Sequence, residues 1–293
     1  MYIDEKGNKW FKGNLHTHTN RSDGSLSPDE VLMQYKQAGY DFVALTDHRI
    51  LSTERDFQGM LVMNGCEFDN GSADFRAGVY HIVGVGLNSD PEEVRTKRNA
   101  EPQEMIDAIS NAGGLAFLAH PAWSFNRPDE VKKLHGIAAT EIYNTFSGAP
   151  WNKHPYSGEF VDMMMLDGYI MNCTATDDSH WYQGEQCRSY IWLKAEECTT
   201  EAIKKAILAG DFYATQGPRF HHEIEDGKLV VYTTPAQTVT FFTDTGYEPD
   251  NVTHGYFVQR AEYKIKRKSF IIRYEITGIN GEMGWSSPIR IEQ

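Results

Sequence analysis

The sequence predicts an α/β protein with a small all-β region at its C-terminal end. From residue 10 to about residue 218, short apolar runs alternate with segments whose apolar residues recur at helical spacing. This alternation is typical of parallel strands joined by crossover helices, and about seven apolar runs can be counted, enough to close a barrel. After residue 218 the helical spacing disappears and strand-like runs separated by turn residues continue. We therefore expect an α/β domain over residues 1–218 and an antiparallel, sandwich-like β domain over residues 219–293.

The helices of the first domain are predicted by their start and stop residues. Ser27, Pro28 and Glu30 form a capping box with proline at the first helical position, and Gly39 stops that helix. Comparable signals predict further helices, over residues 102–113, 128–136, 158–168 and 199–210.

The apolar runs between these helices are the expected strands. The first ends near the sequence HTH at residues 16–18, and the others cover residues 41–48, 61–68, 79–87, 115–121, 137–144 and 169–180. The β domain has its own strand-like runs, at residues 229–234, 238–244, 254–259, 263–277 and 286–293.

Composition and charge exclude several classes of function. The formal net charge is −13, and the longest basic run is KIKRK at residues 264–268, so a nucleic acid polymer is not an expected partner. A small anionic substrate remains compatible with this charge, because bound cations invert the local potential. No apolar run approaches the roughly 18 residues of a membrane span, and the chain does not open on a signal-peptide pattern. The four cysteines show no CxxC spacing, which indicates reduced thiols, and we expect no membrane partner and a cytoplasmic location.

Side chains that can bind a metal ion gather where the expected strands end. His16 and His18 are two residues apart, so on a strand they point to the same side and can bind one ion together, and Asp178 and His180 repeat this spacing. The other candidates, most of them also at strand ends, are Asp23, His48, Glu67, His81 and His120.

One metal centre explains this pattern better than separate structural roles. A lone buried histidine is usually a hydrogen-bonding residue, and an SDG tripeptide is usually a turn, but the candidates together form a consistent set. In parallel barrels the carboxyl ends of the strands meet at one mouth, where active sites are built. Imidazole and carboxylate ligands suit zinc, iron or manganese. The remaining histidines fit no such pattern and are read as surface or structural residues: His135, His154, His221, His222 and His254.

The motifs that carry these residues resemble a known family. In chain order, NLHTHTNRSDG, ALTDH, CEF, HIVGVG, LAHP and TDDSH are similar to the four-motif signature of the PHP (polymerase and histidinol phosphatase) superfamily, over about residues 10–218. The segment GDFYATQGP at residues 210–218 further resembles the end of the catalytic domain in the CehA/McbA-like group. The resemblance implies a distorted (β/α)7 TIM-like barrel and a centre of two or three divalent metal ions.

The resemblance also implies how the ligands are divided among the ions. The first ion would be held by His16, His18, Glu67 and Asp178, the second by Glu67 as a bridge with His81 and His120, and the third by Asp23, His48 and His180. Some family members have histidine at the position of Asp23, and the aspartate form resembles the nucleotide-phosphatase branch more closely. Asp47 is adjacent to a ligand, and we expect it to orient a ligand imidazole from the second layer of residues.

This site predicts a metal-dependent phosphoesterase. The expected reaction is hydrolysis of a small phosphate monoester, such as a nucleotide, by in-line attack of a metal-bound hydroxide. Arginine suits the phosphate group best, and Arg188 is the first candidate because it follows the TDDSH strand closely. Three other arginines are candidates for the same role: Arg21, Arg49 and Arg219. Three tryptophans lie in the expected mouth loops, where one could stack on a base or an aromatic leaving group: Trp123, Trp151 and Trp181.

Two other functions remain open from the sequence. A polarising metal centre also serves carbonyl groups, so the protein could hydrolyse carboxyl or carbamate esters. A non-catalytic binding module stabilised by metal is the third reading, although no ligand position is lost. The sequence predicts neither the oligomeric state nor the role of the β domain.

Overall fold

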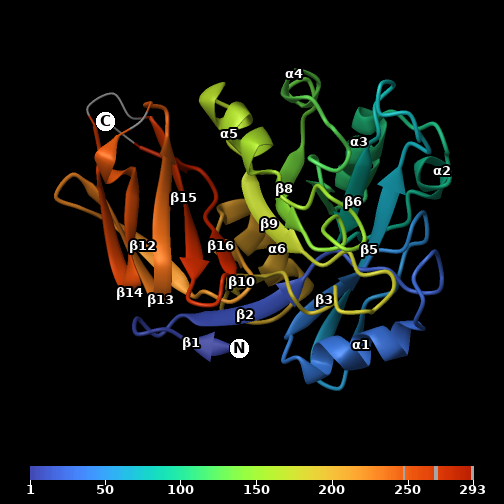
Figure 1. Ribbon diagram of the computed structural model, residues 1–293. Coiled ribbons are helices and arrows are strands. Elements are labelled where there is room, and N and C mark those ends of the chain that lie inside the picture. Colours follow the sequence, from blue (N-terminus) through green and yellow to red (C-terminus); the bar gives the residue numbers. More distant parts are fainter. Residues whose placement is uncertain (247, 267–269, 292–293) are drawn as a thin grey trace.

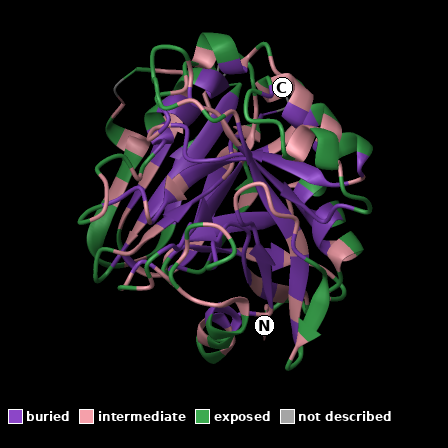
Figure 2. Ribbon diagram, turned by 90° about the vertical axis from the view of Figure 1, so that its right-hand side faces the viewer, coloured by how far each residue is buried: buried purple, intermediate pink, exposed green. Residues whose placement is uncertain are grey.

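The computed structural model describes residues 1–246, 248–266 and 270–291, and it shows a mixed α/β molecule (Figure 1). The strands at its centre are buried, and most of the exposed residues lie in the surrounding helices and loops (Figure 2). Strands of the N-terminal part pair in the order β2, β3, β5, β6, β7, β8, β9. Their bounds are Lys9–Asn14, Phe42–Leu45, Met60–Asp69, His81–Val85, Leu115–Leu118, Ile137–Asn144 and Asn172–Thr176. A parallel bridge between Thr17 and Ser179 joins the segment after β9 to the segment after β2, so the strands form a ring.

One strand of the ring runs against its neighbours. β6 is antiparallel to both β5 and β7, whereas β2, β3 and β5 are parallel, as are β7, β8 and β9. The expectation of parallel strands throughout is therefore wrong at β6. The physical reason is the short connection of residues 70–80, which contains no helix. A parallel pair requires a crossover of a dozen or more residues, so a shorter link reverses the chain. The connection from β3 to β5 also lacks a helix and carries the short strand β4 (Arg55–Phe57) instead.

The predicted helices form, and their ends follow the predicted signals. The Ser27 backbone N–H donates to Glu30 Oε2 at 2.8 Å, which closes one half of the capping box. Gly39, Gly113 and Gly210 follow their helices with φ values of 76°, 77° and 73°, a conformation that glycine adopts at little cost. The bounds are α1 (Pro28–Gln37), α2 (Glu92–Arg95), α3 (Pro102–Asn111), α4 (Pro128–Val131), α5 (Gly158–Leu166) and α6 (Thr200–Ala209). α2 was not predicted, and α4 is shorter than the predicted 128–136.

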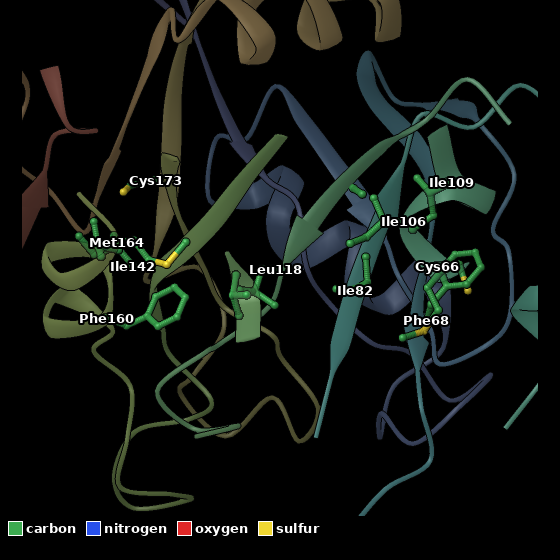
Figure 3. Close-up of a cluster of buried hydrophobic side chains, with 14 of the residues drawn as sticks. Cys66, Phe68, Ile82, Ile106, Ile109, Leu118, Ile142, Phe160, Met164 and Cys173 are labelled. Atoms are coloured by element: carbon green, nitrogen blue, oxygen red, sulfur yellow. The ribbon is translucent and has the colours of Figure 1, made fainter. Parts of the chain in front are cut away.

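Alternation along the strands separates an apolar outer face from an inner face that becomes polar near one end. On β5, Cys66 and Phe68 pack outward with Ile106 and Ile109 of α3, and Ile142 of β8 belongs to the same core (Figure 3). The residues between them in sequence point inward, because successive side chains of a strand alternate. Glu67, His81 and Glu141 are therefore inward-facing and lie toward the end of the ring that we call the mouth, where β3, β5, β8 and β9 end and β6 begins.

Three strands extend the ring outward from β2, and none of them was predicted from the sequence. β1 (Tyr2–Ile3) and β10 (Tyr190–Lys194) pair with β2, and β11 (Phe212–Thr215) pairs with β10, all antiparallel. β10 and β11 flank α6, and they are only five and four residues long. β11 also pairs with β16 of the C-terminal region, so hydrogen bonding continues from one region into the other.

The C-terminal region is antiparallel, as predicted. Its elements are β12 (Phe220–Glu225), β13 (Lys228–Thr243), the 3-10 helix η1 (Pro249–Asn251), β14 (Val252–Lys264), β15 (Ile271–Gly278), β16 (Met283–Trp285) and β17 (Ile289–Arg290). β13 joins two predicted runs into one strand with an irregularity near Ala236, and the predicted run 263–277 is the end of β14 followed by β15. Of the basic run 264–268, Lys266 pairs with Glu248 and Asp250, and residues 267 and 268 lie outside the described residues.

The C-terminal strands pack on the extension of the ring. Val231, Phe241 and Tyr274 share a buried core with Tyr213 of β11, and Trp10 and Trp192 pack against it. The two regions thus share apolar contacts as well as the β11–β16 pairing. A domain boundary at residues 218/219 remains a prediction. Across residues 1–246, 248–266 and 270–291, every helix is too short or too polar to cross a membrane.

Candidate metal centre

The predicted ligands converge on the mouth of the ring. His16 Nε2 and His18 Nε2 lie 3.2 Å apart, as the HxH spacing predicts for side chains on one face. Three overlapping groups of ligand atoms lie close enough to hold metal ions. They are His16, His18 and Asp178; His48, Glu67 and His81; and His18, Asp23, His48 and His180.

Glu67 is the centre of this arrangement. Its Oε2 lies 3.2 Å from His18 Nε2 and 3.2 Å from His48 Nδ1. Its Oε1 lies 2.8 Å from His81 Nδ1 and 3.5 Å from His120 Nε2. One carboxylate therefore faces two sets of imidazoles with its two oxygens, which is the geometry expected of a bridging ligand.

Asp178 supplies the second buried carboxylate. Its Oδ1 lies 3.1 Å from His18 Nε2 and 3.2 Å from His16 Nε2. This buried oxygen accepts no hydrogen bond from the described residues. The buried His48 Nδ1 likewise forms no hydrogen bond with any described residue. A buried carboxylate oxygen without a donor is costly unless a cation compensates it, so the residues present fit a metal ion.

Asp23 closes the outer side of the cluster. Its Oδ1 lies 3.5 Å from His18 Nδ1 and 3.5 Å from His180 Nε2, and its Oδ2 lies 3.6 Å from His48 Nε2. The Asp23 side chain is 53% exposed, in contrast to Glu67 at 1%. The outer position of Asp23 is consistent with a separate ion at the solvent side.

Two of the predicted ligands, His81 and His120, reach the cluster by backbone geometry that the sequence did not show. His81 is the first residue of β6 and not the last, so the reversed direction of that strand places it at the mouth. In β7, Phe117 and Ala119 share the inner core, so His120 would alternate outward on a regular strand. Its φ of 28° ends the strand and turns the imidazole toward Glu67. Such a conformation is strained for a non-glycine residue and is often retained at functional sites.

The sequence prediction missed two carboxylates beside the ligands. Glu141 on β8 is buried, and its Oε1 accepts from His16 Nδ1 at 2.7 Å and from Thr176 Oγ1 at 2.7 Å. Its Oε2 accepts from the His120 backbone N–H at 2.9 Å. The second is Asp69, whose Oδ2 lies 3.4 Å from His48 Nδ1. A charged residue inside the apolar run IAATEIYN was the available signal for Glu141.

Replacing Glu141 with glutamine should weaken metal binding. The carboxylate fixes the tautomer and orientation of His16, so that Nε2 faces the cluster, and it increases the basicity of that nitrogen. Loss of such a partner typically lowers metal affinity by about 10- to 100-fold. Calorimetric titration of Mn²⁺ into chelator-treated protein measures the effect. Glu130→Gln, an exposed glutamate on α4, is the matched control, and equal affinities for the two variants would contradict the assigned role.

Asp47 acts on a loop and not on an imidazole. Its carboxylate accepts from the Thr19 backbone N–H at 2.7 Å and from the Thr19 and Ser22 hydroxyls at 2.8 Å each. In the described part of the chain it has no hydrogen bond to a histidine, which differs from the expected orientation of a ligand imidazole. The bonds fold residues 19–22 back over the mouth and thereby place Asp23.

The candidate arginines are placed very differently. Arg49 lies at the mouth, where its guanidinium pairs with Asp69, the carboxylate beside His48. Arg188 lies on the loop after β9, and its side chain donates to the Gly184 carbonyl oxygen. The backbone N–H of Arg188 donates to Asp177, whose carboxylate also accepts from the neighbouring Cys187 and Ser189 and so shapes this loop.

Arg219 and Arg21 are not brought to the ligands by any described contact. The Arg219 guanidinium lies over the Tyr2 ring, 5.1 Å from its centroid. Tyr2 pairs with Trp10 at the start of β2, which is about 20 Å along an extended chain from His16. The chain turns at residue 216 into the β region, so the described contacts place Arg219 beside Tyr2 and not beside the candidate ligands, and a role in substrate binding stays a prediction. Arg21 lines a surface groove of about 530 Å³ with Arg55 and Ser27.

The predicted tryptophans do lie near the cluster. The Trp123 ring centroid is 5.0 Å from that of His120 and 5.8 Å from that of His81. Phe146 stacks on His180 with 4.3 Å between centroids, and Trp181 and Trp151 surround Phe146.

Three of the histidines that the sequence assigned to surface or structural roles have aromatic neighbours. The exposed His154 packs on Phe125. In the β region, His221 stacks on Tyr232, and His222 forms a hydrogen bond with the Tyr274 hydroxyl.

The electrostatics of the cluster favour a cation. Burial lowers the pKa of His18, but the nearby carboxylates of Asp178 and Glu67, 3.1 and 3.2 Å from its Nε2, outweigh burial and raise the pKa to about 10. Burial raises the pKa of the Asp178 carboxyl, yet His16, His180 and His18 lower it well below its usual range. The carboxylates thus stabilise positive charge at the cluster, whether carried by protons or by metal. Because the two compete, metal binding should release protons and weaken at acid pH.

Comparison with known proteins agrees with this geometry. No family model matches the chain. The chain is 30% identical over 135 residues to a 3′,5′-nucleoside bisphosphate phosphatase of Chromobacterium violaceum, a match that covers 41% of this chain and 46% of that enzyme. It is 29% identical over 129 residues to an uncharacterised protein of Methanocaldococcus jannaschii, covering 38% of this chain and 68% of that protein. The match thus spans less than half of the phosphatase.

A solved structure resembles the whole chain. It is a two-domain protein of Bacteroides vulgatus, described as containing a predicted PHP-like metal-dependent phosphoesterase, with a TM-score of 0.57 and 15% identity. The alignment covers 99% of this chain and 98% of that one. This likeness shows the fold, including the C-terminal β region. The homologue with a named activity is a phosphatase, that is, a hydrolase.

Proposed function

We propose that this protein is a metal-dependent phosphoesterase that hydrolyses a small phosphate monoester. The observation that carries the proposal is the shared carboxylate of Glu67, which faces imidazoles on both of its oxygens. Beside it lies the buried Asp178 Oδ1, which accepts no hydrogen bond from the described residues. The phosphatase among the relatives supports the same reaction class. We also infer that residues 1–218 are a distorted (β/α)7 catalytic domain of the PHP type, in its CehA/McbA-like group, and that residues 219–293 form a separate β domain.

The ligands would hold two or three divalent ions of zinc, manganese or iron. His16, His18, Glu67 and Asp178 would hold the first, Glu67, His81 and His120 the second, and Asp23, His48 and His180 the third. Divalent ions so placed make a nucleophile available from water at neutral pH and neutralise charge on a phosphoryl group. Imidazole and carboxylate donors suit all three metals, so the donor set does not distinguish them.

Residues of the chain itself would position the phosphate ester. Arg49 is the best-placed of the candidate arginines, because its guanidinium lies one carboxylate away from His48. Pairing with Asp69 fixes the orientation of that guanidinium, which presents its remaining N–H groups as directional donors. Arg188 has an exposed side chain on the neighbouring mouth loop and would need to leave the Gly184 carbonyl to reach a substrate.

A substrate panel tests the proposal. Protein treated with chelator and then supplied with Mn²⁺, Zn²⁺ or Fe²⁺ should hydrolyse aryl phosphates or mononucleotides, and the activity should disappear when the chelator is added again. Metal content should reach about two or three ions per chain. If only aryl carbamates were hydrolysed, the proposed phosphoesterase function would be wrong and the protein would be a carbamate hydrolase. Less than one ion per chain, with no activity after reconstitution, would favour a non-catalytic binding module.

A further inference from the structure

Aromatic side chains form a wall beside the outer ligands. We use "aromatic wall" for Phe146 and Trp151, on the loop after β8, together with Trp181, on the loop after β9. The His180 ring stacks on that of His18 with 4.1 Å between centroids, and Phe146 continues the stack at 4.3 Å and 19°. Trp181 meets Phe146 edge-on at 5.0 Å, and Trp151 lies nearly parallel to Phe146 at 6.4 Å. The wall therefore begins at a ligand imidazole and leads outward from it.

The backbone that carries Trp181 is held by a buried carboxylate. Glu185 is fully buried, and its Oε1 accepts from the backbone N–H groups of Trp181 at 2.6 Å, of His180 at 3.3 Å and of Tyr182. Its Oε2 accepts from the Gln183 N–H at 2.8 Å. Because both oxygens of this buried carboxylate accept hydrogen bonds from the loop, they hold the loop backbone in one conformation. The Trp181 indole therefore loses little conformational entropy when it binds a ligand.

Packing within the protein does not account for the position of Trp181. The side chain is 46% exposed, although it follows a ligand residue directly and its main chain is ordered by Glu185. By contrast, Trp123 on the other side of the cluster is half-buried and has its ring against the imidazoles of His81 and His120. An exposed indole on a rigid loop beside a polar site is typical of a binding surface.

We propose that the aromatic wall binds a planar ring in the alcohol portion of the substrate, so that this protein acts on phosphate esters of aryl or nucleoside alcohols. The inference rests on the proposed function, since it places the phosphate at the ligand cluster. A ring joined to phosphorus by a few bonds reaches from the cluster to the Phe146 and Trp181 rings, because Phe146 stacks directly on the imidazole of His180, one of the candidate ligands. Stacking and edge-to-face contacts favour a ring over an alkyl group of equal size.

Kinetics on a matched pair of esters tests the aromatic wall. Trp181→Ala should lower kcat/KM for an aryl phosphate or a mononucleotide about 10-fold, the size expected for one stacking contact, and change that for glycerol phosphate less than about 2-fold. Trp181→Phe should recover most of the loss. Tyr256→Ala, an aromatic residue on β14 that is 93% exposed, is the control and should leave both esters unaffected. An equal loss on both esters, or no loss on either, would overturn the proposal.

Binding of non-hydrolysable analogues separates this inference from the reaction itself. Mn²⁺-loaded protein should bind phenylphosphonate more tightly than methylphosphonate by calorimetry, and Trp181→Ala should remove most of that difference. If the preference for phenylphosphonate depends on Trp181 but no phosphate ester is hydrolysed, the result supports ring binding at the aromatic wall and contradicts the proposed reaction. If esters are hydrolysed but phenylphosphonate binds no more tightly than methylphosphonate, the result supports the reaction and contradicts ring binding at the aromatic wall.

Discussion

Replacing Glu67 with alanine should remove two metal ions and lower kcat/KM for a phosphate ester by about 10³-fold or more. The two Glu67 oxygens face separate sets of imidazoles, so one substitution removes a ligand from both sets. Asp23→Ala should remove only the outer ion, because Asp23 contacts His18, His48 and His180 and has no pairing with His81 or His120 in the described structure. Metal analysis after reconstitution with Mn²⁺, with activity measured in parallel, distinguishes the two variants.

Folding must be measured alongside these metal counts. Glu67 is buried, so its removal could also disturb the mouth, and a thermal melt of each variant together with Glu67→Gln separates the two effects. The glutamine keeps the volume of Glu67 but not its charge, and it should bind metal weakly while melting as a folded protein. Equal metal loss in Glu67→Ala and Asp23→Ala, with both variants folded, would mean that the ligands are wrongly divided among the ions.

Replacing Arg273 with methionine should lower the free energy of unfolding by about 3–5 kcal/mol. Arg273 on β15 is fully buried, and its guanidinium donates to Asp162 of α5, at 2.7 Å for Nη2, and to Glu275. It also lies 4.0 Å from the centroid of the Phe242 ring. Without the guanidinium, the buried Glu275 carboxylate would keep only the Tyr156 hydroxyl as a hydrogen-bond partner among the described residues, and the link between β15 and α5 would be lost.

Urea unfolding followed by tryptophan fluorescence measures this effect. Arg260→Ala removes an exposed arginine of β14 that pairs with Glu262 in the same region, and it should change stability far less, because water screens such a pair. The double variant Arg273→Met with Glu275→Gln should recover part of the loss, since no lone charge is then buried. If the Arg273→Met protein were as stable as the wild type, the attraction within these buried ion pairs would only offset the cost of removing their charges from water.

The sequence alone determined the local structure and most of the candidate ligands. The capping box at Ser27 and the glycine stops at Gly39 and Gly210 act through neighbouring residues, so they can be read from short segments. The HxH spacing of His16 and His18 likewise fixes which side chains share a face of an extended chain. The paired spacings of the histidines and carboxylates, and their positions at strand ends, were enough to predict a metal centre.

Only the tertiary structure decided how the strands pair and what surrounds the ligands. The reversal of β6 places His81 at the mouth, and that direction depends on which segments pack together over long separations in sequence. Glu141 becomes a partner of His16, 125 residues away in sequence, only because β9 alone separates β8 from β2 in the ring. Arg219, which looked suitable in sequence, lies against Tyr2. Periodicity and capping are local properties, whereas these contacts depend on burial and pairing summed over the whole chain.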